Sequence, residues 1–296
     1  MRHKRRSRWA VLPLAALLTA VLAGCTQAQL HGFLPGFVKG EKPVTTNTPL
    51  VDGLWVTAWI VLLIVGFTVW GLIIWTLVVY RRRKGQTGLP VQMQYNMPIE
   101  IFYTVVPLIL IFGFFSFTAH DQNIIEQRYQ HPDQTIEVIA KQWSWDFNYK
   151  TENVYSPGIQ AQPAPGGPQG SVVESKLPTL YLPVNKKVEI LLTSRDVIHS
   201  FWVPAFLYKK DMFPDRINYM SVTPERIGEY AGKCAELCGE YHSQMLFNVK
   251  IVSDKVFMQH MNQLKSEGYS GQLSDSYDRN QNLNGTGAPR ENTPSK

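Results

Sequence analysis

The chain has 296 residues, enough for two domains, and its 29 basic and 23 acidic residues give a formal net charge of +6. Five basic residues precede Cys25 and four more lie at 81–84, which leaves 20 basic against 23 acidic residues elsewhere. Outside these two short clusters no basic face exists that would support nucleic-acid binding.

The first 24 residues have the composition of a lipoprotein-type signal peptide. A basic start is followed by an apolar run from Trp9 to Leu22 and by small residues before a cysteine. Leu22-Ala-Gly-Cys25 resembles a bacterial lipoprotein processing site, so we expect the mature chain to begin at Cys25 with lipid on its sulfur. An ordinary signal peptide or a retained anchor is the alternative. Residues 25–53 show no sustained period and are predicted to form an extracytoplasmic linker.

Two apolar stretches predict a transmembrane helical hairpin over residues 54–119. No charge occurs from Leu54 to Tyr80, which as a helix would span roughly 40 Å, enough to cross a bilayer with tilt. A second helix is expected at about 99–119. The basic loop 81–86 between them is predicted to be cytoplasmic, because short cytoplasmic loops are enriched in Lys and Arg. Both mature termini and the region after the hairpin then face the extracytoplasmic side of the cell membrane.

Residues 120–268 have the pattern of an all-β sandwich. Residues 135–149 alternate in polarity, which would place Trp143, Trp145, Phe147 and Tyr149 on one face of a strand. A Pro/Gly-rich insert at about 156–170 is expected to be a mobile hairpin with no core-forming capacity. Residues 269–296 are predicted to be a disordered tail. Further strand patterns occur at 179–183, 187–193, 217–222 and 247–252, and a short amphipathic helix follows at 253 to about 268.

The strongest chemical motif is Cys234-Ala-Glu-Leu-Cys238-Gly-Glu-Tyr-His242-Ser-Gln-Met245, and His199 stands 35 residues before it. Thiolates and a thioether are soft donors and imidazole is intermediate, so this set favours copper. Zinc would accept the cysteines and histidines but gains little from a methionine. One thiolate would suit a mononuclear site, whereas two can bridge two metals. A disulfide between the cysteines is the alternative outside the cytoplasm.

Three segments together resemble subunit II of the haem–copper cytochrome c oxidases: Gln142–Tyr149, Asp196–Pro204 and Cys234–Met245. The lipoprotein leader and the insert look like those of Gram-positive actinobacterial members. The resemblance implies a cupredoxin-like fold for the sandwich and a dinuclear copper centre (CuA) with two copper ions.

The resemblance also assigns the ligands. His199 and His242 would each bind one copper, while Cys234 and Cys238 would bridge both. The remaining ligands would be Met245, bound weakly, and the backbone carbonyl of Glu236, whose side chain would also reach a magnesium ion at the interface with the catalytic subunit.

Two residues outside the ligand set receive roles from the same resemblance. Trp143 matches the tryptophan at which electrons enter from cytochrome c, against the alternative of a buried core aromatic. Glu100, seven residues before Pro107, matches a glutamate at the mouth of a proton channel. An acid at the edge of a membrane helix is a functional candidate, against the alternative of a headgroup-layer residue. Four apolar residues are candidates to wall the copper centre off from water, against the equal alternative of plain sandwich core: Phe201, Trp202, Leu237 and Leu246.

The implied function is that of subunit II of an aa3-type, proton-pumping cytochrome c oxidase. Its copper centre would accept electrons from a c-type cytochrome and pass them to haem in subunit I, where oxygen is reduced to water. The sequence contains no Cys-x-x-Cys-His motif for covalent haem, so the donor would be another polypeptide, expected to be the haem c subunit of a cytochrome bc complex. The alternatives are a membrane-tethered copper chaperone and the copper-free scaffold subunit of a quinol oxidase.

Overall fold

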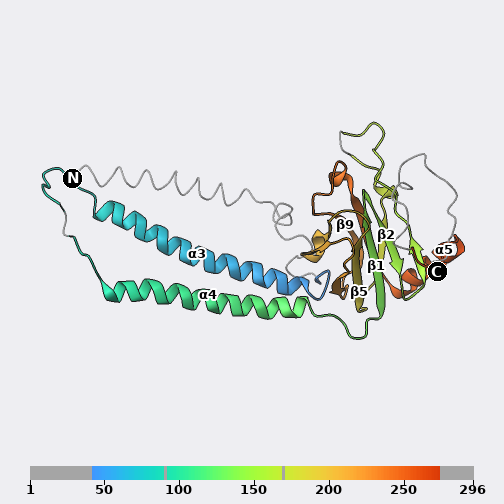
Figure 1. Ribbon diagram of the computed structural model, residues 1–296, viewed down its shortest axis with the longest axis horizontal. Coiled ribbons are helices and arrows are strands. Elements are labelled where there is room, and N and C mark those ends of the chain that lie inside the picture. The colour runs from blue at the N-terminus through green and yellow to red at the C-terminus, as the bar shows by residue number, and fades with distance from the viewer. Residues whose placement is uncertain (1–41, 90–91, 169–170, 274–296) are drawn as a thin grey trace. The chain divides into compact units, whose positions relative to one another are not determined.

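The computed structural model describes residues 42–89, 92–168 and 171–273 (Figure 1). The predicted signal peptide, Cys25 and residues 274–296 lie outside these ranges. The chain divides into two compact units: a helical unit that covers residues 49–130, and a β unit to which the described residues before 49 and after 130 belong.

The helical unit contains two long helices, α3 (Thr48–Val79) and α4 (Met97–Ile125). Both are long and apolar enough to cross a membrane. In each helix, no residue of the apolar stretch is buried within the protein. Helix α3 begins before its predicted start at 54 and ends at Val79, and α4 exceeds its predicted bounds at both ends, because hydropathy detects only the part of a helix that suits lipid. As a result α3 includes residues 48–53, which were predicted to be linker.

The start of α4 is a reciprocal cap. The side chain of Asn96 accepts a hydrogen bond from the backbone N–H of Ile99 at 3.3 Å. In return, the carboxylate of Glu100 accepts from the backbone N–H of Asn96 at 2.9 Å. Two N–H groups that the helix leaves without partners are thereby satisfied, as in a capping box.

The β unit is a sandwich of two five-stranded sheets. One sheet has the order β3-β2-β1-β5-β8 and the other the order β4-β10-β9-β6-β7. Most neighbours are antiparallel, but β1 pairs with β5 and β4 with β10 in parallel. The strands are β1 (Gln134–Lys141), β2 (Ser144–Tyr149), β3 (Val154–Ser156), β4 (Thr179–Pro183), β5 (Val188–Ser194), β6 (His199–Val203), β7 (Tyr208–Met212), β8 (Asn218–Val222), β9 (Gly228–Cys234) and β10 (Leu246–Val252), followed by helix α5 (Asp254–Ser266).

Aromatic side chains from both sheets fill the core. Trp145, Phe147 and Tyr149 of β2 are fully buried, as their alternation predicts. The ring of Trp145 lies 4.9 Å from that of Phe247 in β10 and 6.0 Å from that of Phe201 in β6, measured between centroids. Because Phe201 belongs to the strand that starts with His199, this aromatic cluster supports the base of the candidate metal centre.

Trp143 does not belong to the face it was predicted to share. The expected single strand 135–149 is two strands, β1 and β2, which pair antiparallel with Lys141 opposite Ser144. Gln142 and Trp143 therefore form the turn between them, and Trp143 is half-buried. The turn has neither Gly, Asn nor Pro, so the usual sequence signs of a tight hairpin are missing.

Three segments expected to be structureless contact the sandwich. In the predicted linker, Val44 is fully buried, and residues 45 and 46 pair with residues 224 and 223. At the start of the insert, the N–H of Gly158 bonds to Asp146, and a Cβ on Gly158 would lie 2.0 Å from the carbonyl oxygen of Trp145. In the predicted tail, Leu273 exchanges two hydrogen bonds with the side chain of Asn148. Composition did not reveal these partners, because they are distant in sequence.

Candidate metal centre

The backbone of two adjacent strands brings the halves of the motif together. His199 opens β6 and Cys234 closes β9, and these strands pair with Phe201 opposite Cys234. The loop that follows Cys234 returns to β10 at Leu246, and its ends are joined where the N–H of Cys234 donates to the carbonyl of Met245 at 3.0 Å. The indole N–H of Trp145 donates to the same carbonyl at 3.3 Å. The loop is therefore anchored at both ends.

Two sulfur atoms form the middle of the site. The Sγ atoms of Cys234 and Cys238 lie 3.9 Å apart, far longer than the roughly 2.05 Å of a disulfide, and both cysteines are free and buried. Nδ1 of His199 lies 3.7 Å from the sulfur of Cys234, and Nδ1 of His242 lies 3.5 Å from that of Cys238. Each imidazole thus stands beside a different member of the cysteine pair.

The two weaker donors complete this arrangement. Sδ of Met245 is 3.7 Å from the sulfur of Cys238, and the carbonyl oxygen of Glu236 is 3.2 Å from the sulfur of Cys234. The structure therefore brings together every group predicted as a copper ligand. The residues fit a copper pair in their chemistry, because the two sulfurs can serve both metals while each end offers its own imidazole and one weak donor.

The cysteine pair has an uneven affinity for protons. The pKa of Cys234 is lowered to about 3, because Cys238 and then His199 hydrogen-bond to its sulfur, although burial opposes this. The pKa of Cys238 is raised by its hydrogen bond to Cys234 and by burial. Because a metal binds cysteine as thiolate, the raised pKa of Cys238 means that metal binding is accompanied by release of a proton.

Asp196 fixes the orientation of His199. Its carboxylate lies 2.8 Å from Nε2 of His199, so that Nε2 donates and Nδ1 is free to face Cys234. Burial acts to lower the pKa of His199, but the hydrogen bonds to Asp196 and Cys234 outweigh it and raise this pKa. The pKa of Asp196 is lowered, because hydrogen bonds from His199 and two backbone N–H groups outweigh burial.

The β1–β2 turn contacts the opposite end of the cysteine pair. The side-chain amide of Gln142 and the indole N–H of Trp143 both donate to the carbonyl of Cys238, at 2.8 and 3.2 Å. The backbone N–H of Gln142 also donates to Asp196 at 2.7 Å. The turn thus connects the Asp196–His199 contact with Cys238. The sequence did not predict these roles of Gln142 and Asp196, although both residues lie in the segments that resemble the family.

The match to known proteins decides the family. A family model described as cytochrome C oxidase subunit II, periplasmic domain, matches residues 134–252. A Streptomyces avermitilis protein named "Probable cytochrome c oxidase subunit 2" is 41% identical over 286 residues, covering 87% of this chain and 86% of that protein. The chain belongs to the cytochrome c oxidase subunit II family.

Other family members agree. The cytochrome c oxidase subunit 2 of Mycobacterium tuberculosis is 32% identical over 299 residues, covering 85% of this chain and 81% of that one. A crystal structure of the periplasmic domain of subunit II from Bradyrhizobium japonicum is 31% identical, covering 47% of this chain and 99% of that chain, with a TM-score of 0.41.

Family membership confirms the main predictions. Two long apolar helices precede a cupredoxin-like β-sandwich, and the protein is a membrane-anchored subunit of an oxidoreductase complex whose catalytic site lies in subunit I. Members of the cytochrome c oxidase subunit II family bind copper, and the donor atoms of His199, Cys234 and Cys238 lie within 4.8 Å of one another here.

The residues expected to wall off the candidate metal centre differ in how far they are buried. Of the expected wall residues of this subunit II, Phe201 is buried and Trp202 and Leu246 are half-buried. Leu237 is 79% exposed, so its assignment as a wall residue is wrong, since the turn between the two cysteines directs it outward. Glu100 lies in the helical unit, where its carboxylate caps α4.

Proposed function

We propose that this subunit holds a dinuclear copper centre that accepts electrons from a c-type cytochrome and passes them to haem in subunit I of an aa3-type oxidase. There, oxygen is reduced to water. The observation that supports this best is the unbonded cysteine pair, 3.9 Å apart, with one imidazole beside each sulfur. The ligands would be His199, Cys234, the carbonyl of Glu236, Cys238, His242 and Met245.

Cys234 and Cys238 would hold the copper pair between them, and the pair would supply a one-electron redox site that changes little in structure on reduction, so that electron transfer would be fast. The chain's own residues hold the ligands still for this purpose. Asp196 fixes His199, the loop ends are pinned at Met245, and the buried ring of Phe201 keeps water from the base of the centre.

Trp143 is the proposed point at which electrons enter. Its ring is half-buried and its N–H is bonded to the carbonyl of Cys238, so one side chain connects the protein surface to a ligand. Its ring also packs edge-on against Tyr241, with 4.9 Å between centroids. The donor would be a c-type cytochrome, which in a relative of the actinobacterial proteins would be the haem c subunit of a cytochrome bc complex.

Three further assignments belong to the same proposal. The exposed carboxylate of Glu236 would reach a magnesium ion at the interface with subunit I, while its carbonyl faces Cys234. Glu100 would lie at the mouth of a proton channel, held in place by its cap on Asn96. Cys25 would carry lipid, and the basic residues 81–84 would keep the hairpin loop cytoplasmic, so that both mature termini face outward.

The test is a metal count and an EPR spectrum of the full-length subunit purified within its oxidase. Two coppers for each chain, counted in addition to the copper of the haem–copper catalytic subunit, and a mixed-valence signal shared over both metals are expected. One copper with an ordinary Cu(II) signal, or a disulfide with no tightly bound metal, would contradict the proposal.

A further inference from the structure

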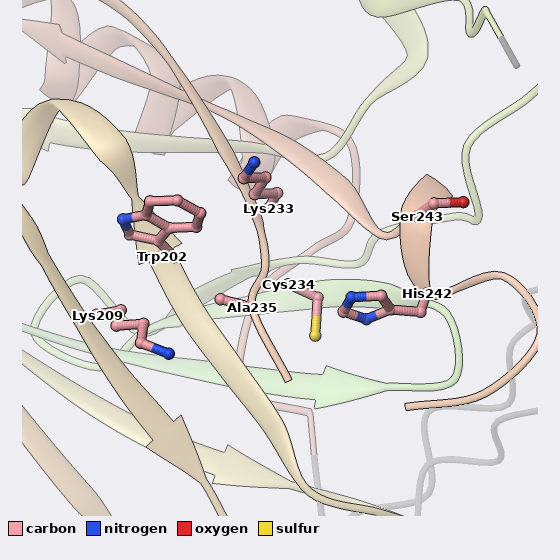
Figure 2. A pocket seen from close by; sticks show the side chains of 7 residues that line it. All are labelled: Trp202, Lys209, Lys233, Cys234, Ala235, His242 and Ser243. Carbon is pink, nitrogen blue, oxygen red and sulfur yellow. The ribbon is translucent and has the colours of Figure 1, made fainter. Parts of the chain in front are cut away.

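A cavity of about 470 Å³ opens beside one end of the candidate metal centre. Cys234 and His242 contribute to its wall, and Trp202, Lys209 and Lys233 stand around the rest of it (Figure 2). Trp143 does not line it; its contact is with Cys238. The cavity therefore adjoins the metal centre at Cys234 and His242, away from the contact between Trp143 and Cys238 through which electrons are proposed to enter.

The sheet places two lysines on either side of one indole. Trp202 in β6 is directly opposite Lys209 in β7 and directly opposite Lys233 in β9. Directly paired residues project from the same face of a sheet, so these three side chains form a row across three strands. The preceding residue, Phe201, is fully buried, and the alternation along β6 therefore directs Trp202 away from the core.

Among the described residues, Lys209 and Lys233 have no acidic partner. The ammonium of Lys233 lies 4.5 Å from the centre of the Trp202 ring, a cation–π distance. Across residues 42–89, 92–168 and 171–273, neither Lys209 nor Lys233 forms an ion pair, whereas Lys250 on the same sheet bonds to Glu229 at 2.8 Å. Both lysines are exposed, and Ser243 also lines the cavity.

We infer that this cavity, which is lined by Lys209, Trp202 and Lys233, receives a carboxylate presented by subunit I of the oxidase. The inference extends the proposed function by naming the chemistry of the contact beside Cys234 and His242. A carboxylate complements the positive charge of the two ammonium groups. Because the cavity is open, a free anion would be held weakly against screening by salt, whereas a docked subunit supplies its carboxylate at high effective concentration.

The first experiment is zero-length cross-linking of the intact oxidase. A carbodiimide activates a carboxylate, and a lysine amine in contact with it displaces the urea to form an amide. We expect amides between Lys209 or Lys233 and an acidic residue of subunit I, identified by mass spectrometry. If both lysines are joined only to acids of this chain, only to the mobile donor cytochrome, or to nothing, the inference is wrong.

The second experiment reverses the charges. In K209E/K233E, we expect subunit I to co-purify about tenfold less than with wild type, because truncating or reversing one side of a close charge pair is costly. The matched control is K255E/K265E, the same charge change at two exposed lysines of α5, which should co-purify as wild type does. Co-purification of K209E/K233E at the wild-type level would overturn the inference.

The copper spectrum of each preparation separates this inference from the proposed function. A normal spectrum with lost co-purification supports the docking contact. Absence of the mixed-valence spectrum from wild type would contradict the proposed function instead and leave the cross-linking result to stand by itself. If K209E/K233E fails to fold, the cross-linking result with the wild-type oxidase decides whether the inference holds.

Discussion

Trp143 donates its indole N–H to the backbone carbonyl of Cys238 at 3.2 Å. The contact joins a half-buried ring in the β1–β2 turn to the backbone of Cys238, whose sulfur is one of the two central sulfurs of the candidate metal centre. Gln142 donates to the same carbonyl, so the position of Cys238 does not depend on Trp143 alone. The ring and the ligand loop can therefore be tested separately.

Replacing Trp143 with Phe should slow electron entry while leaving the metal bound. Phe keeps an aromatic ring but loses the N–H that reaches Cys238, a hydrogen bond worth about 0.5–1.5 kcal/mol. The rate at which reduced cytochrome c reduces the copper centre should fall in rapid mixing, with unchanged copper content. Trp75→Phe in α3 is the control, because it makes the same substitution outside the β unit that holds the candidate metal centre. An unchanged rate in Trp143→Phe would remove Trp143 from the electron path.

Replacing Gly239 with Ala should disturb both the backbone and the contact of Trp143. Gly239 has φ +121°, and an added Cβ would lie 3.1 Å from Cζ2 of Trp143 and 3.3 Å from the amide nitrogen of Gln142. We expect a loss of about 1–3 kcal/mol in the free energy of unfolding and an altered copper spectrum. Gly268→Ala is the matched control, with φ +88° and nothing near its Cβ. Gly268→Ala should lose stability but keep the wild-type copper spectrum. If the two variants have equal spectra, the added Cβ at residue 239 does not disturb the contacts of Trp143 and Gln142.

Replacing Asp196 with Asn should weaken metal binding. The carboxylate orients His199 through Nε2, and loss of such a partner typically lowers metal affinity by about 10–100-fold. Competition with a chelator measures the affinity, and Asp254→Asn, at the exposed start of α5, should retain the wild-type value. Wild-type affinity in Asp196→Asn would show that the sheet alone orients the imidazole.

Replacing Asp146 with Asn should destabilise the β unit strongly. Its carboxylate bonds to Lys141 at 2.7 Å and to Arg195 at 2.5 Å, and all three side chains are at most 4% exposed. Removing one member of a buried ionic cluster typically costs about 3–5 kcal/mol, measurable by denaturant unfolding. The control is Glu229→Gln, which breaks the exposed pair with Lys250 and should cost no more than about 1 kcal/mol. Similar losses in both variants would contradict the role of burial.

The sequence was sufficient for those features that depend on local pattern. The bounds of β4 match the predicted 179–183, and α5 lies within the predicted 253–268. The ligand set could be predicted because its spacing is chemically specific. The turn at Gln142 and Trp143, the anchoring of Leu273 on Asn148 and the outward direction of Leu237 could not, since each depends on a distant partner or on backbone direction rather than on composition.

His260 in α5 should make the stability of the β unit depend on pH. Its ring stacks on Tyr181 with 3.8 Å between centroids, and its Nε2 is buried without a hydrogen-bond partner among the described residues. Burial lowers the pKa of His260, while Glu267 opposes and Lys250 supports this shift. The unfolded chain therefore binds the proton more readily, so the free energy of unfolding should fall as the pH drops below about 6.5, by at most about 1.4 kcal/mol per pH unit from this group.

Urea unfolding between pH 5 and pH 8 (roughly the range in which histidine titrates) measures the slope of the free energy of unfolding against pH. His260→Phe keeps the stacked ring without the titration and should reduce the slope, whereas an unchanged slope would assign the dependence to other groups.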